Sequence, residues 1–239
     1  MYLLVTGFYA FLSHLDYFYA AVAAYLCGCF NGALFTSRLF FHDDVRTHGS
    51  GNAGLTNFYR TYGARYALLV IACDMLKAVA AVSFAAWLGA RFDPRMLPDL
   101  PLTAAEQAEY VLHFKYWAGF FCVVGHMFPC TAKFRGGKGI LCSATLTLLL
   151  DWRIALVCWS LFAVLWLTTR YVSLGSVAAA ISFPITTQLV FRDWGLTALG
   201  TCIALLVLWA HRSNIKRLLN GTESKFHFHV NGSKTGEDA

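Results

Sequence analysis

Seven stretches of mainly apolar residues, separated by short polar segments, account for most of this 239-residue chain. A membrane-spanning helix needs about 17 to 25 such residues to cross the hydrocarbon core of a bilayer. We expect spans at about residues 17–40, 64–90, 114–130, 139–151, 154–170, 173–191 and 194–210. The sequence therefore predicts an all-α polytopic membrane protein with about seven transmembrane helices.

The composition argues against the common soluble classes. Charged residues make up only 13% of the chain, against about 25% in an ordinary soluble domain. The net charge of +6 does not indicate a nucleic-acid partner, because the basic residues lie at the ends of apolar runs. The eight cysteines form no CxxC pair and match no zinc-site spacing. We expect no metal site and no cofactor.

The distribution of Lys and Arg predicts the orientation. With seven spans, 13 of the 19 basic residues fall on the side of the C-terminus and 5 on the other side. Because basic residues are retained in cytoplasmic loops, we expect an outside N-terminus and a cytoplasmic C-terminus.

The chain reads as one domain with a tail. We expect residues 1–222 to form a single integral membrane domain and residues 223–239 a polar, poorly ordered cytoplasmic tail. Residues 1–12 lack a basic segment and a cleavage site, so we expect them to remain in the mature chain. On the outside, Thr103 followed by Glu106 is a capping-box pattern, which predicts a short interfacial helix ending near His113.

The residues able to do chemistry gather on the expected cytoplasmic side. The first motif has three glycines that allow successive backbone N–H groups to point at one anion: Gly49, Gly51 and Gly54. Its side-chain donors are Ser50, Asn52, Thr56 and Asn57. Arg60 follows with a planar guanidinium suited to phosphate oxygens. A single loop of this kind is more often a flexible connector.

A second motif combines His126 with a basic, glycine-rich turn before the fourth span. The turn contains Lys133, Arg135, Gly136, Gly137, Lys138 and Gly139. Glycines and a lysine at a helix N-terminus form an anion site through backbone geometry and the helix dipole. Alone, such a loop is more often a topology signal, but two of them on one face favour phosphate binding.

Polar residues also occur in two of the spans and directly after a third. Ser173 and Ser176 begin the sixth span, and His211 and Asn214 follow the seventh. Asp74 and Lys77 lie three residues apart in the second span, where they can pair with each other. Ionisable residues within a span mark a functional site by default, although a structural ion pair is the alternative.

Taken in order, these motifs resemble those of the bacterial acyl-phosphate:glycerol-3-phosphate acyltransferase family (PlsY). The resemblance covers about residues 28–223 and rests on five segments: Gly49–Gly63, Asp74–Lys77, Gly125–Gly139, Arg170–Ser176 and His211–Glu223. The chain departs from the family pattern at Asn31, Ala53 and Ala78.

The resemblance implies transfer of a fatty acyl group from acyl phosphate to the 1-hydroxyl of glycerol 3-phosphate, giving lysophosphatidic acid and phosphate in phospholipid biosynthesis. It also implies a multi-pass protein of the bacterial inner membrane with a cytoplasmic active site. The expected partners are these two substrates and the lipid bilayer, with no obligate protein partner.

Several residues are therefore expected to act on substrate. The expected catalytic residues are Ser50, Arg60, His126, Lys138, His211 and Asn214. The expected substrate-binding residues are Gly49, Gly51, Asn52, Gly54, Thr56, Asn57, Asp74, Lys77, Lys133, Arg135, Gly136, Gly137, Gly139, Ser173 and Ser176. No histidine has an aspartate five positions later and there is no GxSxG elbow, so we expect direct attack rather than an acyl-enzyme.

Two alternatives remain at this point. A small anion or metabolite transporter could use the same loops as a phosphate gate, although no internal repeat is visible in the sequence. The same fold could also use acyl-CoA as its donor.

Overall fold

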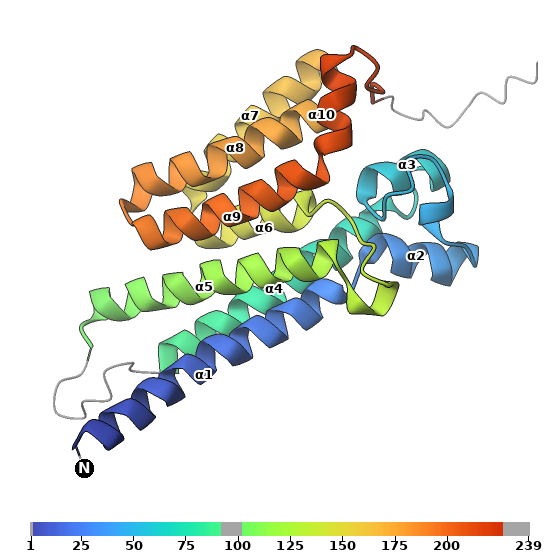
Figure 1. Cartoon of the computed structure of the whole chain (residues 1–239). Helices are drawn as coiled ribbons and strands as arrows, with labels where there is room; N and C mark the ends of the chain where they lie inside the picture. Colours follow the sequence, from blue (N-terminus) through green and yellow to red (C-terminus); the bar gives the residue numbers. More distant parts are fainter. Residues whose placement is uncertain (1, 92–101, 227–239) are drawn as a thin grey trace, which may run out of the picture.

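The chain is a bundle of helices (Figure 1). The computed structural model describes residues 2–91 and 102–226, and this part of the chain contains helices and loops but no strand. Its helices are α1 (Tyr2–Cys29), α2 (Gly32–Phe41), η1 (Val45–Thr47), α3 (Leu55–Tyr62), α4 (Ala67–Arg91), α5 (Ala104–Met127), η2 (Cys130–Ala132), α6 (Ile140–Leu150), α7 (Trp152–Thr169), α8 (Val172–Phe191), α9 (Trp194–Ala210) and α10 (Arg212–Leu219). The predicted all-α class is confirmed. Residues 92–101 of the outside loop and 227–239 of the tail lie outside the described residues.

Each of the seven predicted spans coincides with a helix or a helix pair. Four segments among the described residues are long and apolar enough to cross a membrane: Leu15–Phe41, α4, α7 and α8. The bent pair α9 and α10, with 61° between its helices, makes a fifth if it counts as one span. α6 has 11 residues and is about 16 Å long at 1.5 Å per residue, so it is too short to span alone. The count of seven stays a prediction.

The helices form two groups that meet along α5 and α6. α1, α4 and α5 pack together, and α7, α8 and α9 form the other group (Figure 1). Small residues bring the first group close: a Cβ on Gly28 would lie 2.3 Å from the carbonyl oxygen of Cys122, and one on Gly125 would lie 2.2 Å from that of Tyr25. Such direct backbone contact is typical of membrane helices. Larger side chains, including Tyr116 of α5 and Phe183 of α8, pack where the two groups meet.

Two helix boundaries differ from the prediction. The capping box at Thr103 and Glu106 is present, but the helix that it opens does not end near His113. It continues as α5 to Met127, because the residues after His113 are mainly apolar and the break comes at Phe128 and Pro129. The first predicted span is interrupted at Asn31, which caps α2 by accepting a hydrogen bond from the backbone N–H of Leu34 at 2.9 Å.

Candidate active site

The structure brings the polar motifs together at one end of the bundle. The connections before and after α3, the turn between α5 and α6, and α10 all lie at this end (Figure 1). Hydrogen bonds join these segments across the bundle. The predicted gathering of the motifs on one side is therefore observed, independently of which side of the membrane it is.

Asn57 organises the first glycine loop from inside. Its amide nitrogen donates to the carbonyl oxygens of Val45 and His48 at 2.9 and 3.1 Å, and its side-chain oxygen accepts from the N–H of Ser50 at 2.9 Å. The side chain is buried. Its polar atoms therefore serve the loop, whereas the Ser50 side chain is exposed. Gly49 and Gly51 in the same loop have φ of +55° and +69°, where glycine is strongly preferred.

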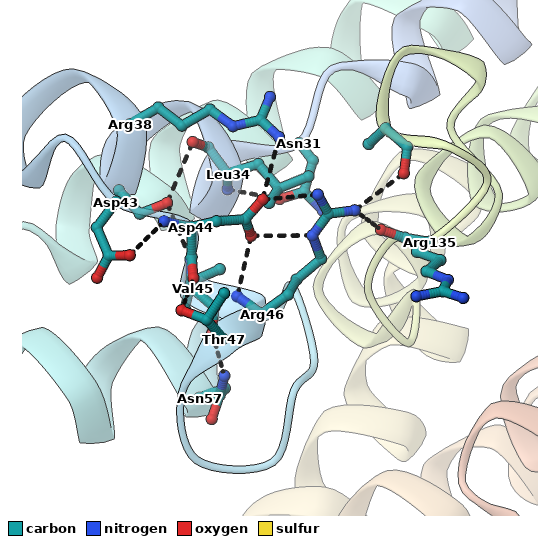
Figure 2. Close-up of polar contacts among 12 residues, drawn as sticks. Asn31, Leu34, Arg38, Asp43, Asp44, Val45, Arg46, Thr47, Asn57 and Arg135 are labelled. Atoms are coloured by element: carbon teal, nitrogen blue, oxygen red, sulfur yellow. Dashed lines mark hydrogen bonds and ion pairs between the residues drawn. The ribbon is translucent and has the colours of Figure 1, made fainter.

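The side chain of Arg46 joins this loop to the second loop, which is the basic, glycine-rich turn between α5 and α6 (Figure 2). Arg46 makes two hydrogen bonds to the carboxylate of Asp44, at 2.9 and 2.6 Å. Its remaining terminal nitrogen donates to the carbonyl oxygens of Ala132 and Arg135, at 2.9 and 3.0 Å. The guanidinium of Arg46 holds the pKa of Asp44 well below its usual value. The two loops are thus held at a fixed separation by one side chain.

The second loop packs tightly against the end of α5. The N–H of Gly137 donates to the carbonyl oxygen of His126 at 3.1 Å, and that of Gly136 donates to Met127 at 3.0 Å. A Cβ on Gly136 would lie 2.0 Å from the oxygen of His126. These glycines are required by close approach. Gly139 instead has φ of +81° and caps the N-terminus of α6.

Lys138 leaves this loop and enters a polar network with the C-terminal segment. Its ammonium donates to the side-chain oxygen of Asn214. The amide of Asn214 in turn donates to Glu223 at 2.7 Å. Ser173 donates to the same oxygen of Glu223 at 2.7 Å, and Arg217 donates to the other at 2.6 Å. The network therefore joins the second loop, α8, α10 and the segment after it.

This network has more positive than negative charge. Burial, followed by the positive charges of Arg217 and Arg60, lowers the pKa of Lys138 to about 8, and Glu223 opposes them. Burial raises the pKa of Glu223, but hydrogen bonds from Ser173, Asn214 and Arg217 bring it below its ordinary value. Lys138 thus lies near two other cations and one ionised carboxylate, which pairs directly with Arg217. An anion entering the site would relieve the repulsion among the cations.

The segment after α10 lies over the site. Arg60 donates to the carbonyl oxygen of Ser224 at 3.3 Å, and the N–H of Phe226 donates to that of Arg170 at 2.8 Å. Glu223 has a side chain only 7% exposed. Residues 223–226, which the sequence assigns to the tail, therefore pack on the bundle.

His211 lies buried at the junction of α9 and α10. Its Nδ1 is 2.8 Å from the carbonyl oxygen of Val207. Because a carbonyl can only accept, Nδ1 carries the proton and Nε2 is left as an acceptor. The charges of Lys138 and Glu223 both act on this imidazole, which places it beside the cation-rich network.

Asp74, Lys77 and His126 form a separate cluster, buried behind the loops. Lys77 Nζ lies 2.8 Å from Asp74 Oδ1 and 2.7 Å from His126 Nδ1. Asp74, His126 and Cys142 offer three metal-ligand atoms within 4.8 Å of one another. The ammonium of Lys77 already supplies a positive charge next to two of them, so these residues do not need a metal ion for charge balance.

The other expected site residues have varied positions. Lys133 and Arg135 have exposed side chains, and Asn52 and Thr56 are partly exposed near Gly54, the N-cap residue of α3. Ser176 donates to the carbonyl oxygen of Val172 in its own helix at 2.8 Å. That bond ties its hydroxyl to the backbone of α8.

Three residues that the structure places in or beside the site were not predicted from the sequence. Arg46 and its partner Asp44 precede the glycine loop, and Glu223 ends a motif without being assigned a role. A signal existed for the first pair, since Asp-x-Arg directly before a glycine-rich loop can form a local ion pair. Nothing in the sequence indicates that Arg46 reaches carbonyl groups some 86 residues away.

A helical bundle with apolar spans and a cation-rich polar site at one end is typical of a membrane enzyme that acts on an anionic substrate. Comparison with known proteins agrees with this class. The family model for glycerol-3-phosphate acyltransferase matches residues 18–221. The glycerol-3-phosphate acyltransferase of Fusobacterium nucleatum is 34% identical over 212 residues, which cover 89% of this chain and 99% of that protein. The chain therefore belongs to the glycerol-3-phosphate acyltransferase family.

Solved structures agree with this assignment. A crystal structure of PlsY, described as an integral membrane glycerol 3-phosphate acyltransferase in its glycerol 3-phosphate form, superposes with a TM-score of 0.74 at 27% identity. It covers 88% of this chain and 96% of that one. The lysophosphatidic acid form of PlsY gives a TM-score of 0.71 at 26% identity, with coverage of 88% and 95%. The predicted resemblance is confirmed, and this chain is a multi-pass membrane protein.

Proposed function

We propose that this chain transfers a fatty acyl group from acyl phosphate to the 1-hydroxyl of glycerol 3-phosphate, giving lysophosphatidic acid and inorganic phosphate. The observation that carries the proposal is the polar network around Lys138, in which the charges of Arg217 and Arg60 act on this lysine and Glu223, paired with Arg217, is the carboxylate that opposes them. Both substrates carry a phosphate, and this arrangement favours one. The PlsY structures in glycerol 3-phosphate and lysophosphatidic acid forms support the choice of acceptor and product.

Acyl transfer from acyl phosphate mainly requires that the enzyme position the two substrates and stabilise the charge that develops during the reaction. Acyl phosphate is already activated, because phosphate is a good leaving group. In the proposed step the hydroxyl oxygen of glycerol 3-phosphate bonds to the acyl carbon, and the bond from that carbon to the phosphate oxygen breaks. Lys138 and Arg60 would stabilise the charge that develops on the departing phosphate. Ser50, Ser173 and Asn214 would orient the substrates.

The proton of the attacking hydroxyl needs an acceptor. The expected catalytic residues include two histidines able to take it, His126 and His211, and a phosphate of the substrate is a third candidate. We assign it to Nε2 of His211, because its Nδ1 proton is held by Val207 and the imidazole lies beside Lys138. The proton then passes to the released phosphate, so the enzyme returns to its starting state.

The assay uses the full chain purified in detergent. Phosphate release from palmitoyl phosphate is followed with and without glycerol 3-phosphate, and palmitoyl-CoA serves as the parallel donor. We expect release that depends on glycerol 3-phosphate, together with formation of lysophosphatidic acid. If lysophosphatidic acid forms with palmitoyl-CoA but not with palmitoyl phosphate, the proposed donor is wrong. Folded protein inactive with both donors would overturn the proposed reaction and favour a transporter.

We also propose that the site end faces the cytoplasm of a bacterial inner membrane, as the basic residues predict. Cys130 is exposed at this end, so a variant that retains only this cysteine reports the orientation. A membrane-impermeant maleimide should label it in permeabilised cells and leave it unlabelled in intact ones. Labelling in intact cells would reverse the proposed orientation.

A further inference from the structure

Lys77 lies where the first membrane helix breaks. Its ammonium is 2.6 Å from the carbonyl oxygen of Phe30 and 3.3 Å from that of Gly28, at the C-terminal end of α1. It also pairs with Asp74 at 2.8 Å. Carbonyl and carboxylate oxygens can only accept hydrogen bonds from it. These partners require a charged ammonium at this position, and Lys77 is only 6% exposed.

The same ammonium fixes the state of His126. Nδ1 of His126 is 2.7 Å from Lys77 Nζ. Because an ammonium has donors and no acceptor, Nδ1 must accept, which leaves the ring neutral with its proton on Nε2. His126 therefore differs from His211, whose proton lies on Nδ1. The one ring proton of His126 is on Nε2, and Nδ1 already accepts a hydrogen bond from Lys77. Nδ1 is therefore not suited to take a proton from the substrate.

The other edge of the His126 ring supports the second loop. A Cβ on Gly137 would lie 2.2 Å from His126 Nε2, so the ring packs directly on this glycine. The N–H of Gly137 donates to the backbone oxygen of His126. The next residue is Lys138, whose ammonium belongs to the cation-rich network. A continuous path of contacts thus runs from the end of α1 through Lys77, His126 and Gly137 to Lys138.

We propose that Lys77 is a positioning residue, which holds His126 as its neutral Nε2–H tautomer against Gly137 and so places Lys138 for phosphate binding. This inference rests on the proposed function for its kinetic consequence, and on geometry alone for the tautomer. It differs from the expectation that Lys77 itself contacts glycerol 3-phosphate, because the Lys77 ammonium already has four acceptor atoms around it.

The tautomer can be measured without substrate. The full chain is labelled with ¹⁵N-histidine in detergent, and the His126 signals are assigned by their absence in His126→Asn. We expect an unprotonated Nδ1 and a protonated Nε2 in the wild type, and a shift toward a mixture of tautomers in Lys77→Met. A wild-type ring protonated on Nδ1 would overturn the proposal, and this measurement stands even if Lys77→Met does not fold. An unchanged spectrum in Lys77→Met would also overturn it.

Kinetics test the consequence for the site. A displacement of about 1 Å in a positioned group costs about a hundredfold in rate, so we expect Lys77→Met to lower kcat/KM by about tenfold to a hundredfold, with a raised KM for phosphate-bearing substrate. A purely structural role would reduce the amount of folded enzyme and leave KM unchanged. Lys115→Met is the matched control, since Lys115 lies near the middle of α5, away from His126, and donates only to Leu149 at 3.4 Å among the described residues.

A double variant tests the path itself. If Lys77 acts through His126, then Lys77→Met combined with His126→Asn should be no worse than His126→Asn alone. Losses in kcat/KM that multiply would overturn the proposal. An inactive wild type would instead contradict the proposed function, while the tautomer measurement would still decide the assignment of His126.

Discussion

Two lysines that look alike in the sequence have opposite situations in the structure. Lys77 is enclosed by acceptors from α1, α4 and α5. Lys138 has Asn214 as its hydrogen-bond partner among the described residues, and two further cations act on it. A buried charge with all its partners supplied by the protein stabilises an arrangement, whereas a partly satisfied one can bind a ligand. The comparison separates the residues that build the site from those that contact substrate.

The largest effect is expected from substitution of Lys138. Lys138→Ala removes one of the cations proposed to stabilise the departing phosphate, so we expect turnover to fall by about a thousandfold, with Arg60→Ala close behind. Steady-state release of phosphate measures the loss, and size-exclusion chromatography checks that the protein is folded.

Arg153→Ala is the control for loss of positive charge. Arg153 pairs with Asp151 at 2.9 Å at the start of α7, far along the bundle from the site (Figure 1). It should keep nearly wild-type turnover. Equal activity of Lys138→Ala and Arg153→Ala would show that the cation-rich network does not bind the phosphate that reacts.

A smaller loss is expected from breaking the contact between the two loops. Arg46→Ala removes the hydrogen bonds to Ala132 and Arg135, so the two loops can separate and kcat/KM should fall by about tenfold to a hundredfold. Arg38→Ala is a matched control, because Arg38 also pairs with Asp44, at 3.2 Å, but its side chain is 52% exposed (Figure 2). Similar losses in both variants would show that the ion pair to Asp44, and not the contact with the second loop, is what matters.

The sequence predicts those features of the fold and the site that depend on residues close together in the chain, and it does not predict those that depend on residues far apart. Apolar runs predicted the helices because a bilayer requires long apolar segments with internally bonded backbone. The break at Asn31 was not predicted, because its side chain combines the local cap of Leu34 with a hydrogen bond to the carbonyl oxygen of Ala53, 22 residues away, which the sequence does not indicate. Motifs located Lys77 and Lys138, but only their neighbours in space distinguish the two roles. Glu223 was overlooked because its partners come from two separate helices, Ser173 from α8 and Asn214 and Arg217 from α10.

The charge on Lys138 predicts how activity depends on pH. Its pKa of about 8 lies below the ordinary value of 10.5, so the ammonium is present below pH 8 and is lost as the pH rises above it. We expect kcat/KM, which reports the free enzyme, to fall above pH 8 by up to about tenfold per pH unit. Arg217, Arg60, Glu223 and His211 are the other charged or titratable groups near this lysine.

Lys138→Arg separates this titration from the others. A guanidinium stays protonated at these pH values, so the variant should lose the decline above pH 8 even if its absolute rate is lower. A decline that persists in Lys138→Arg would assign the titration to substrate or to another residue.

The smallest expected effect comes from a contact between the two regions. Cys29 ends α1, next to the carbonyl group that Lys77 binds, and Cys130 begins η2 in the second loop. Their sulfur atoms lie 3.7 Å apart, and a disulfide needs about 2.05 Å. Diamide should therefore join them, removing two protons and two electrons from the thiols while the diazene bond is reduced to a hydrazine.

Mass spectrometry of the digested protein would identify the linked peptides, which should be absent from Cys130→Ser. Because the sulfurs need to move by less than 2 Å, we expect activity to change by less than about twofold. Failure to link would show that the end of α1 and the second loop are not held together. A large loss of activity on linking would mean that the end of α1 and the second loop must move relative to each other during turnover. The region around Lys77 and the region around Lys138 would then not be as separate as the comparison of the two lysines indicates.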